Sequence, residues 1–184
     1  MAAGDKFRSS KGAHDPISGM KGRITTEHWH IHAGLAFEAG YLREGANSYD
    51  IIIDTNEALH LKEVITTVND SEVKAAIYRN PTYNEEGENN ENIPLDNSNE
   101  LSDIELDAEF IFTEEVTNVG ELVGGTRNYL PGTDTAGGQG EGETADWEIV
   151  LDPDNTYLYR VEKAEGTSEF RCHSRFKMYI VGDK

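Results

Sequence analysis

The sequence contains a single cysteine, Cys172, among its 184 residues. One thiol excludes an internal disulfide and a cysteine-based zinc finger. No run of roughly 18 apolar residues occurs, so we expect no membrane-spanning helix. The opening residues MAAGDKFRSSKGAHDPISG also lack the apolar core of a signal peptide. The sequence therefore predicts no membrane partner.

Basic residues are scarce as well. Sixteen Lys and Arg stand against 35 Asp and Glu, which gives a formal charge of −19 at pH 7. Between Arg79 and Arg127 there is no basic residue, whereas 13 acidic residues occur. Affinity for nucleic acid comes chiefly from Lys and Arg that neutralise phosphates, so direct nucleic-acid binding is not expected. A solvated acidic surface keeps a protein soluble at high concentration; adaptation to salty surroundings is an alternative.

The length fits one domain with a terminal arm. Residues 1–23 contain five basic and two acidic residues, and they show no apolar periodicity. We predict that they form a flexible basic arm, disordered in the free protein, and that residues 24–184 form a single domain. The composition is 36% hydrophobic and 9% aromatic, which is too apolar for a disordered chain.

Alternation with a period of two dominates the body. Ile104, Leu106, Ala108, Phe110 and Phe112 fall on one side of a predicted strand, with acidic residues between them. The run from 170 to 180 is similar. Its predicted inner face comprises Phe170, Cys172, Ser174, Phe176, Met178 and Ile180.

Shorter β-branched runs predict further strands at 49–54 and 75–78. The segments 147–151 and 157–161 flank a Pro- and Asx-containing turn, which predicts a hairpin. Residues 55–68 fit a strand better than a capped helix. Residues 33–43 are interpreted as a loop or one short helical turn, and 81–100 and 131–145 as long loops. Together these patterns predict an all-β antiparallel sandwich, of jelly-roll type.

Three histidines, at positions 28, 30 and 32, stand close together. In an extended strand they share one face at a spacing of about 7 Å, which suits two ligands of a zinc or iron ion. Cupins, which are jelly-roll enzymes, use such an H-x-H pair, and His28 and His30 imitate it. The Glu that follows the pair in cupins is missing, however, and His173 lacks the matching context. We therefore predict no metal, no cofactor and no catalytic residues.

Other sites are equally unsupported by the sequence. Asp152, Asp154 and Asn155 resemble the opening of a calcium loop, but the glycine and the distal Glu are missing. The Gly-rich stretch at 137–142 does not follow a strand and open a helix, as a phosphate-binding loop must. Cys172 falls on an apolar face, where a thiol acts as a small hydrophobe.

The outward face of the last predicted strand is basic. Arg171, Arg175 and Lys177 lie on one side, two or four residues apart. Two interpretations remain open: pairing with acidic neighbours across the sheet, or docking to an acidic partner or a second subunit. The candidate interface residues are Lys6, Arg8, Lys11, Arg171, Arg175 and Lys177.

Several ordered segments resemble a family of small structural proteins from tailed bacteriophages. Residues 15–19 (DPISG) precede residues 30–37 (HIHAGLAF), which are similar to the His- and Gly-containing signature of that family. Leu130-Pro131-Gly132 and residues 147–160 (WEIVLDPDNTYLYR) follow in the same order. The matching positions are His30, His32, Gly34, Phe37, Trp147, Pro153, Tyr157 and Arg160. Residues 96–100 depart from the family pattern, because they lack its Arg.

The resemblance implies a non-enzymatic virion protein, a decoration or cement protein on the outer capsid surface that stabilises the shell. It implies the major capsid protein as partner and a homo-oligomer, with a trimer favoured. A head-fibre or tail-associated component is the alternative within virions. A cupin-like metalloenzyme that uses His28 and His30 is the alternative from another class.

Overall fold

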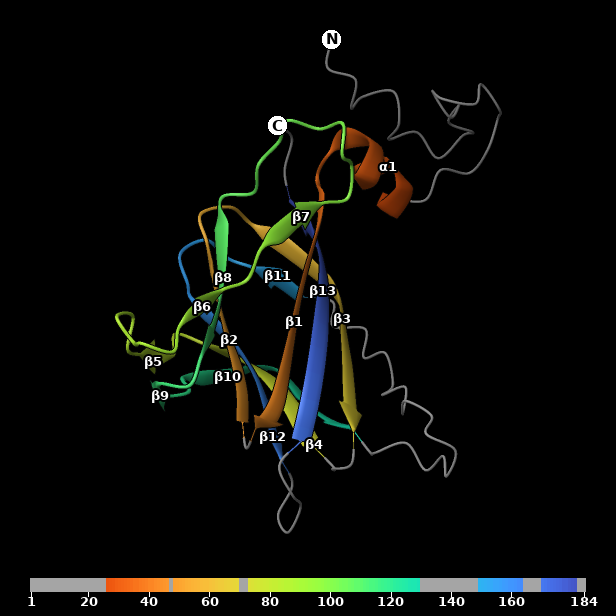
Figure 1. Cartoon of the computed structure of the whole chain (residues 1–184). Coiled ribbons are helices and arrows are strands. Elements are labelled where there is room, and N and C mark those ends of the chain that lie inside the picture. The colour runs from red at the N-terminus through yellow and green to blue at the C-terminus, as the bar shows by residue number, and fades with distance from the viewer. Residues whose placement is uncertain (1–25, 47, 70–72, 130–148, 164–169, 182–184) are drawn as a thin grey trace, which may run out of the picture.

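The computed structural model describes residues 26–46, 48–69, 73–129, 149–163 and 170–181. Two antiparallel sheets face each other across an apolar core, with one short helix at one end (Figure 1). No helix in these ranges is long and apolar enough to cross a membrane. The arm 1–23 lies outside the described residues, as do residues 130–148.

The two sheets contain most of the chain. The five-stranded sheet has the order β11-β3-β13-β1-β7, with bounds Ile149–Leu151, Leu59–Asn69, Phe170–Ile180, Ala36–Ala46 and Leu95–Asn97. The six-stranded sheet has the order β10-β4-β12-β2-β8-β6, with bounds Glu121–Tyr129, Val73–Arg79, Tyr157–Lys163, Ser48–Thr55, Ala108–Thr113 and Glu91–Asn92. A small ribbon pairs β5 (Thr82–Tyr83) with β9 (Val116–Asn118), and α1 (Thr26–Ala33) precedes β1.

The connectivity is that of a jelly roll. The first strand pairs with the last (β1 with β13) in one sheet, and the second pairs with the last but one (β2 with β12) in the other. β3 then adds to β13, and β4 adds to β12. Such wrapping of a folded-over ribbon defines the jelly roll, so the predicted all-β sandwich is confirmed. The excursion between β4 and β10 supplies β7 and β8, which widen both sheets.

The core follows the predicted alternation. Every residue of the predicted inner face of β13 is buried, while Arg171, His173 and Arg175 are exposed. Phe176 packs edge-on against Phe110 and Tyr159 of the opposite sheet, with ring centroids 5.5 and 5.2 Å apart. The predicted strand at 104–112 begins only at 108, although its alternation of burial starts at Ile104.

The outer face of the six-stranded sheet is also partly buried. Paired positions form one apolar row across five strands: Leu122, Tyr78, Leu158, Ile52 and Ile111. Ile52 and Leu158, in the middle of this row, are completely buried, whereas Leu122 at the edge is half exposed. Burial raises the pKa of Tyr83 on β5, and the charges of Glu85, Asp54 and Glu109 add to that rise; Asp54 and Glu109 belong to this outer face.

Three sequence-based expectations are corrected. The predicted hairpin around 152–155 is wrong: the turn forms, but β11 pairs with β3 in one sheet and β12 with β2 and β4 in the other. The chain therefore crosses between the sheets at the turn. Residues 33–43 are the end of α1 and the first part of β1 rather than a loop. The predicted loop 81–100 contains the short strands β5, β6 and β7.

The strand interpretation of residues 55–68 is confirmed by β3. At the far edge of the six-stranded sheet, β10 carries a bulge between Val123 and Thr126. Gly124 and Gly125 there have φ of 76° and 83°, a conformation that glycine adopts without strain.

Candidate functional site

The predicted histidine cluster lies on α1 rather than on a strand. The strand interpretation is wrong because the chain turns helical from Thr26. A helical backbone does not bring residues two apart to one face, as a strand does, so this segment is not the H-x-H strand of a cupin. The helix also packs outside the sandwich: the ring of His30 lies 4.9 Å from that of Tyr179, on the outer side of β13.

Histidines gather around Tyr179. His60 on β3 lies 6.3 Å from the Tyr179 ring, and the Lys62 Nζ lies 5.9 Å from its centroid. Tyr179 is only 5% exposed. Among the described residues, no group of three or more His, Cys, Asp and Glu stands close enough to hold a metal ion. The rings therefore pack α1 onto the five-stranded sheet.

Gly34 ends the helix and begins the sheet. Its φ is 71°, and its N–H donates to the Ile31 carbonyl at 3.0 Å, while the Leu35 N–H donates to the His30 carbonyl at 2.9 Å. This pair of bonds is a Schellman cap. A Cβ at position 34 would lie 2.0 Å from the Ser102 Oγ. Both the backbone conformation and the space therefore require glycine.

The other described positions of the resembling segments are structural too. Phe37 is a core residue of β1, and His32 is exposed at the end of α1. Pro153 stands in the turn that joins β11 to β12, where the Asn155 N–H donates to the Asp152 carbonyl. The Tyr157 hydroxyl accepts from the Asp152 N–H at 3.0 Å. Trp147 lies outside the described residues.

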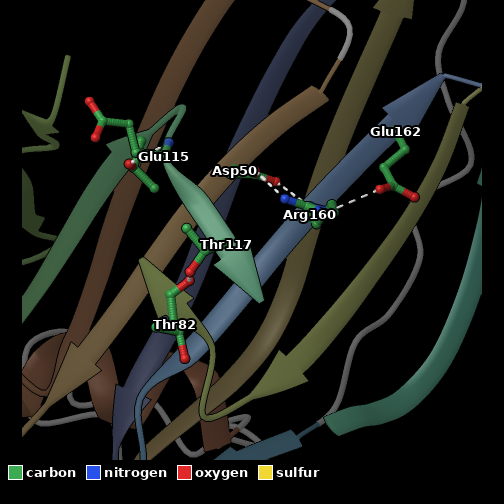
Figure 2. Close-up of polar contacts among 7 residues, drawn as sticks. Asp50, Thr82, Glu115, Thr117, Arg160 and Glu162 are labelled. Carbon is green, nitrogen blue, oxygen red and sulfur yellow. Dashed lines mark hydrogen bonds and ion pairs between the residues drawn. The ribbon is translucent and has the colours of Figure 1, made fainter. Parts of the chain in front are cut away.

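Arg160 makes a buried ion pair with Asp50. Its Nε and Nη2 donate to the two carboxylate oxygens at 2.7 and 2.6 Å, and its Nη1 lies 3.3 Å from Glu162 (Figure 2). Asp50 is 2% exposed, and the Arg160 side chain 15%. Burial raises the pKa of Asp50, and Arg160 opposes that rise. The hydrogen bonds to Asp50 raise the pKa of Arg160.

This pair lies on the outer face of the six-stranded sheet, directly across the β2–β12 ladder. Nearby, the Thr117 hydroxyl of β9 donates to the Thr82 carbonyl of β5 at 3.1 Å, which fastens the small ribbon (Figure 2). A bidentate guanidinium–carboxylate pair fixes the register of two strands. Sequence alone did not suggest Asp50, because its partner is 110 residues away.

The basic residues of β13 are oriented as predicted. Arg175 donates to Glu38 on β1, and the Arg171 Nε lies 3.1 Å from the Glu44 Oε1 on the same strand. Lys177 stands opposite Glu38 in the ladder. The arginines are about half exposed. These contacts favour pairing across the sheet; a role at an interface stays a prediction. Lys6, Arg8 and Lys11 lie outside the described residues.

The two sheets are joined at one edge by side chains that the sequence analysis missed. The Tyr41 hydroxyl on β1 donates to Glu91 on β6 at 2.7 Å, and its ring stacks on Phe112 at 4.7 Å. Arg43 pairs with Glu114 just beyond β8 and also lies over Phe112. Burial and the Glu91 hydrogen bond raise the pKa of Tyr41 to about 12. Tyr41 shares the inward side of β1 with Phe37 and Ala39, a period of two that the interpretation of residues 33–43 as a loop or helical turn overlooked.

Cys172 is fully buried on the inner face of β13, as its position in the alternation predicted. Burial raises the pKa of its thiol to about 12. A thiol of this kind is protonated at neutral pH and is a poor nucleophile. The Asp152–Asn155 segment, which resembles a calcium loop in sequence, uses an Asp152 carboxylate oxygen to accept from the Asp154 N–H.

The chain matches no family model, no curated protein and no solved structure at a significant level.

Proposed function

We propose that this chain is a structural virion protein of a tailed phage, a decoration or cement protein on the outer capsid surface that stabilises the shell. One observation carries the proposal: apart from His32, which is exposed, the described positions that resemble the phage family build the scaffold. They cap α1, fill the core, close the β11–β12 turn and pair β2 with β12. A signature of this kind encodes a shape and a surface rather than a reaction centre.

The fold and the charge support the same function. Jelly rolls are common in virion proteins, although cupin enzymes share them. A formal charge of −19 keeps a protein soluble and monomeric at high copy number before it assembles. In this proposal the protein is not an enzyme, needs no cofactor, and has the major capsid protein and its own copies, as a trimer, for partners.

A purified particle tests the proposal directly. Phage that encode this chain are purified through a density gradient, and the protein is quantified per particle. We expect many copies, accessible to antibodies on intact heads. Particles that lack the gene should assemble but lose their DNA at lower temperature or lower ionic strength than the parent. Absence of the protein from purified particles would contradict the proposal.

Copy number and position separate this function from a fibre or a tail component. A fibre or tail protein would be present in few copies and labelled at vertices or tails. The cupin-like alternative is separated by metal analysis of the purified protein. A cupin holds about one metal ion per chain, and in that case the ion would be lost on His30→Ala.

A further inference from the structure

An exposed leucine stands at the tip of the connection between β7 and β8. Leu101 is 93% exposed, whereas the other large apolar side chains that are exposed in the described ranges lie between 45% and 54%. Burying a leucine side chain stabilises a complex, and the full exposure of Leu101 leaves that gain unused in the free protein. A single exposed leucine is ordinary on a protein surface, so its exposure alone does not mark a site. The connection around Leu101 is well braced.

Side chains within the connection hold its backbone. The Asn97 Oδ1 accepts from the Asn99 N–H at 2.8 Å, and the Asn99 Oδ1 accepts from the Leu101 N–H at 3.1 Å. The Ser102 N–H donates to the Asn99 carbonyl at 2.9 Å, and the Ser102 hydroxyl accepts from the Ile104 N–H at 3.2 Å. These four hydrogen bonds brace the backbone of the tip.

The same connection is fastened to the end of α1. The Asn97 amide donates to the Gly34 carbonyl at 3.0 Å, and the Asn99 amide reaches the His32 carbonyl at 3.4 Å. Ser102 fills the space that a side chain on Gly34 would need. Figure 1 shows the connection passing beside α1 at one end of the sandwich. A loop ordered in advance loses little conformational entropy on binding.

The surroundings of Leu101 are acidic. Glu100, Asp103 and Glu105 are exposed beside it, and the sequence has no Lys or Arg between positions 79 and 127. Electrostatic complementarity calls for a partner with basic side chains around the leucine. A second copy that met this loop tip to tip would present the same acidic residues and be repelled, and the β13 arginines of such a copy are already paired with Glu38 and Glu44. The partner is therefore a different protein.

We propose that residues 97–104 form a docking loop, and that Leu101 inserts into an apolar socket rimmed by Lys and Arg on the outer surface of the shell protein. This inference rests on the proposed function. The docking loop and the end of α1 lie at the same end of the sandwich (Figure 1). That end faces the shell.

Binding of the full-length protein to shells made without it tests the docking loop. Purified protein is titrated onto such shells, and occupancy is measured by sedimentation. Leu101→Ser should raise the half-saturating concentration about 10- to 100-fold, which follows from the burial of one leucine. Leu122→Ser is the matched control, because Leu122 is half exposed on β10, and it should bind as the parent does.

Charge reversal tests the rim of the socket. Glu100→Lys with Asp103→Lys should weaken binding at low salt, whereas Glu86→Lys with Glu88→Lys, in another exposed acidic loop, should not. Melting temperatures of the two charge-reversal variants should match the parent, since none of the four acids is buried. If the parent binds shells and Leu101→Ser binds with the same half-saturating concentration, the docking-loop proposal is overturned, but the proposed function is not. Failure of the parent itself to bind shells overturns both.

Discussion

The outer faces of the two sheets use the same chemistry in opposite ways. On the six-stranded sheet, Arg160 and Asp50 form a bidentate pair that is nearly closed off from solvent. On the five-stranded sheet, Arg175 pairs with Glu38, and the arginine is about half exposed. A buried charge without its partner is costly, while an exposed pair is screened and contributes little. The buried Arg160–Asp50 pair therefore fixes the register of β2 and β12. The exposed Arg175–Glu38 pair contributes little to stability and mainly determines the charge pattern of the surface.

The largest expected effect comes from breaking the buried pair. Arg160→Met leaves the Asp50 carboxylate buried without a partner and should lower the free energy of unfolding by about 3–5 kcal/mol, measured by urea denaturation. The double variant Asp50→Leu with Arg160→Met removes both charges and should recover much of the loss. Equal damage in the single and double variants would show that the pair has no special role.

Matched leucines compare the two outer faces without charge. Leu158, on the outer face of the six-stranded sheet, is completely buried, whereas Leu42, on β1, is 45% exposed. Leu158→Ala should cost about 2–5 kcal/mol of unfolding free energy. Leu42→Ala should change it by less than about 0.5 kcal/mol. If both substitutions lowered the unfolding free energy by similar amounts, the outer face of the six-stranded sheet would not be covered more than that of the five-stranded sheet.

Helix α1 covers one end of the otherwise open face, and its cap is the next test. Gly34→Ala forces a side chain into the left-handed conformation and against Ser102. We expect a loss of about 1–3 kcal/mol in thermal or urea unfolding. The second variant Gly34→Ala with Ser102→Gly relieves the contact but not the backbone strain, so it should recover only part of that loss.

Tyr41 connects the two sheets and gives a pH-dependent signal. Its pKa in the folded protein is about 12, above the usual value near 10. Its contribution to stability is therefore fully present below pH 10 and is lost as the pH rises through 12. In a tyrosinate absorbance titration of the folded protein, Tyr41→Phe should remove a late-titrating tyrosine. Loss of a tyrosine that titrates near pH 10 would contradict this assignment.

The smallest effect is expected for the exposed arginines. Arg171→Gln and Arg175→Gln should each change stability by less than about 1 kcal/mol, and less still in 1 M salt. Reversal of Arg171, Arg175 and Lys177 to Glu should preserve the fold. If that variant assembles and binds shells as the parent does at low salt, these residues are only a solvated face.

Alternation predicted the strands well, because a strand that buries one face has an apolar residue at every second position. It therefore placed Phe176 in the core and Arg175 outside it. The helix α1 was missed, since its eight residues include no strong helix formers besides Glu27 and Ala33, and the Asn97 and Asn99 side chains that hold its end stand far along the chain. The turn at Pro153 was recognised, but a turn does not tell whether its flanking strands pair or cross between sheets. The Asp50–Arg160 pair could not be predicted, because only the pairing of β2 with β12 brings these two residues together.

The bulge of two glycines in β10 has a consequence for crowded conditions. β10 is the last strand of its sheet in the described part of the chain, and an open edge is a template for unwanted strand pairing. The left-handed backbone at Gly124 and Gly125 breaks the regular spacing of N–H and C=O groups along that edge. A stray strand that approaches β10 therefore finds no continuous ladder of N–H and C=O groups to join, which disfavours aggregation through this edge.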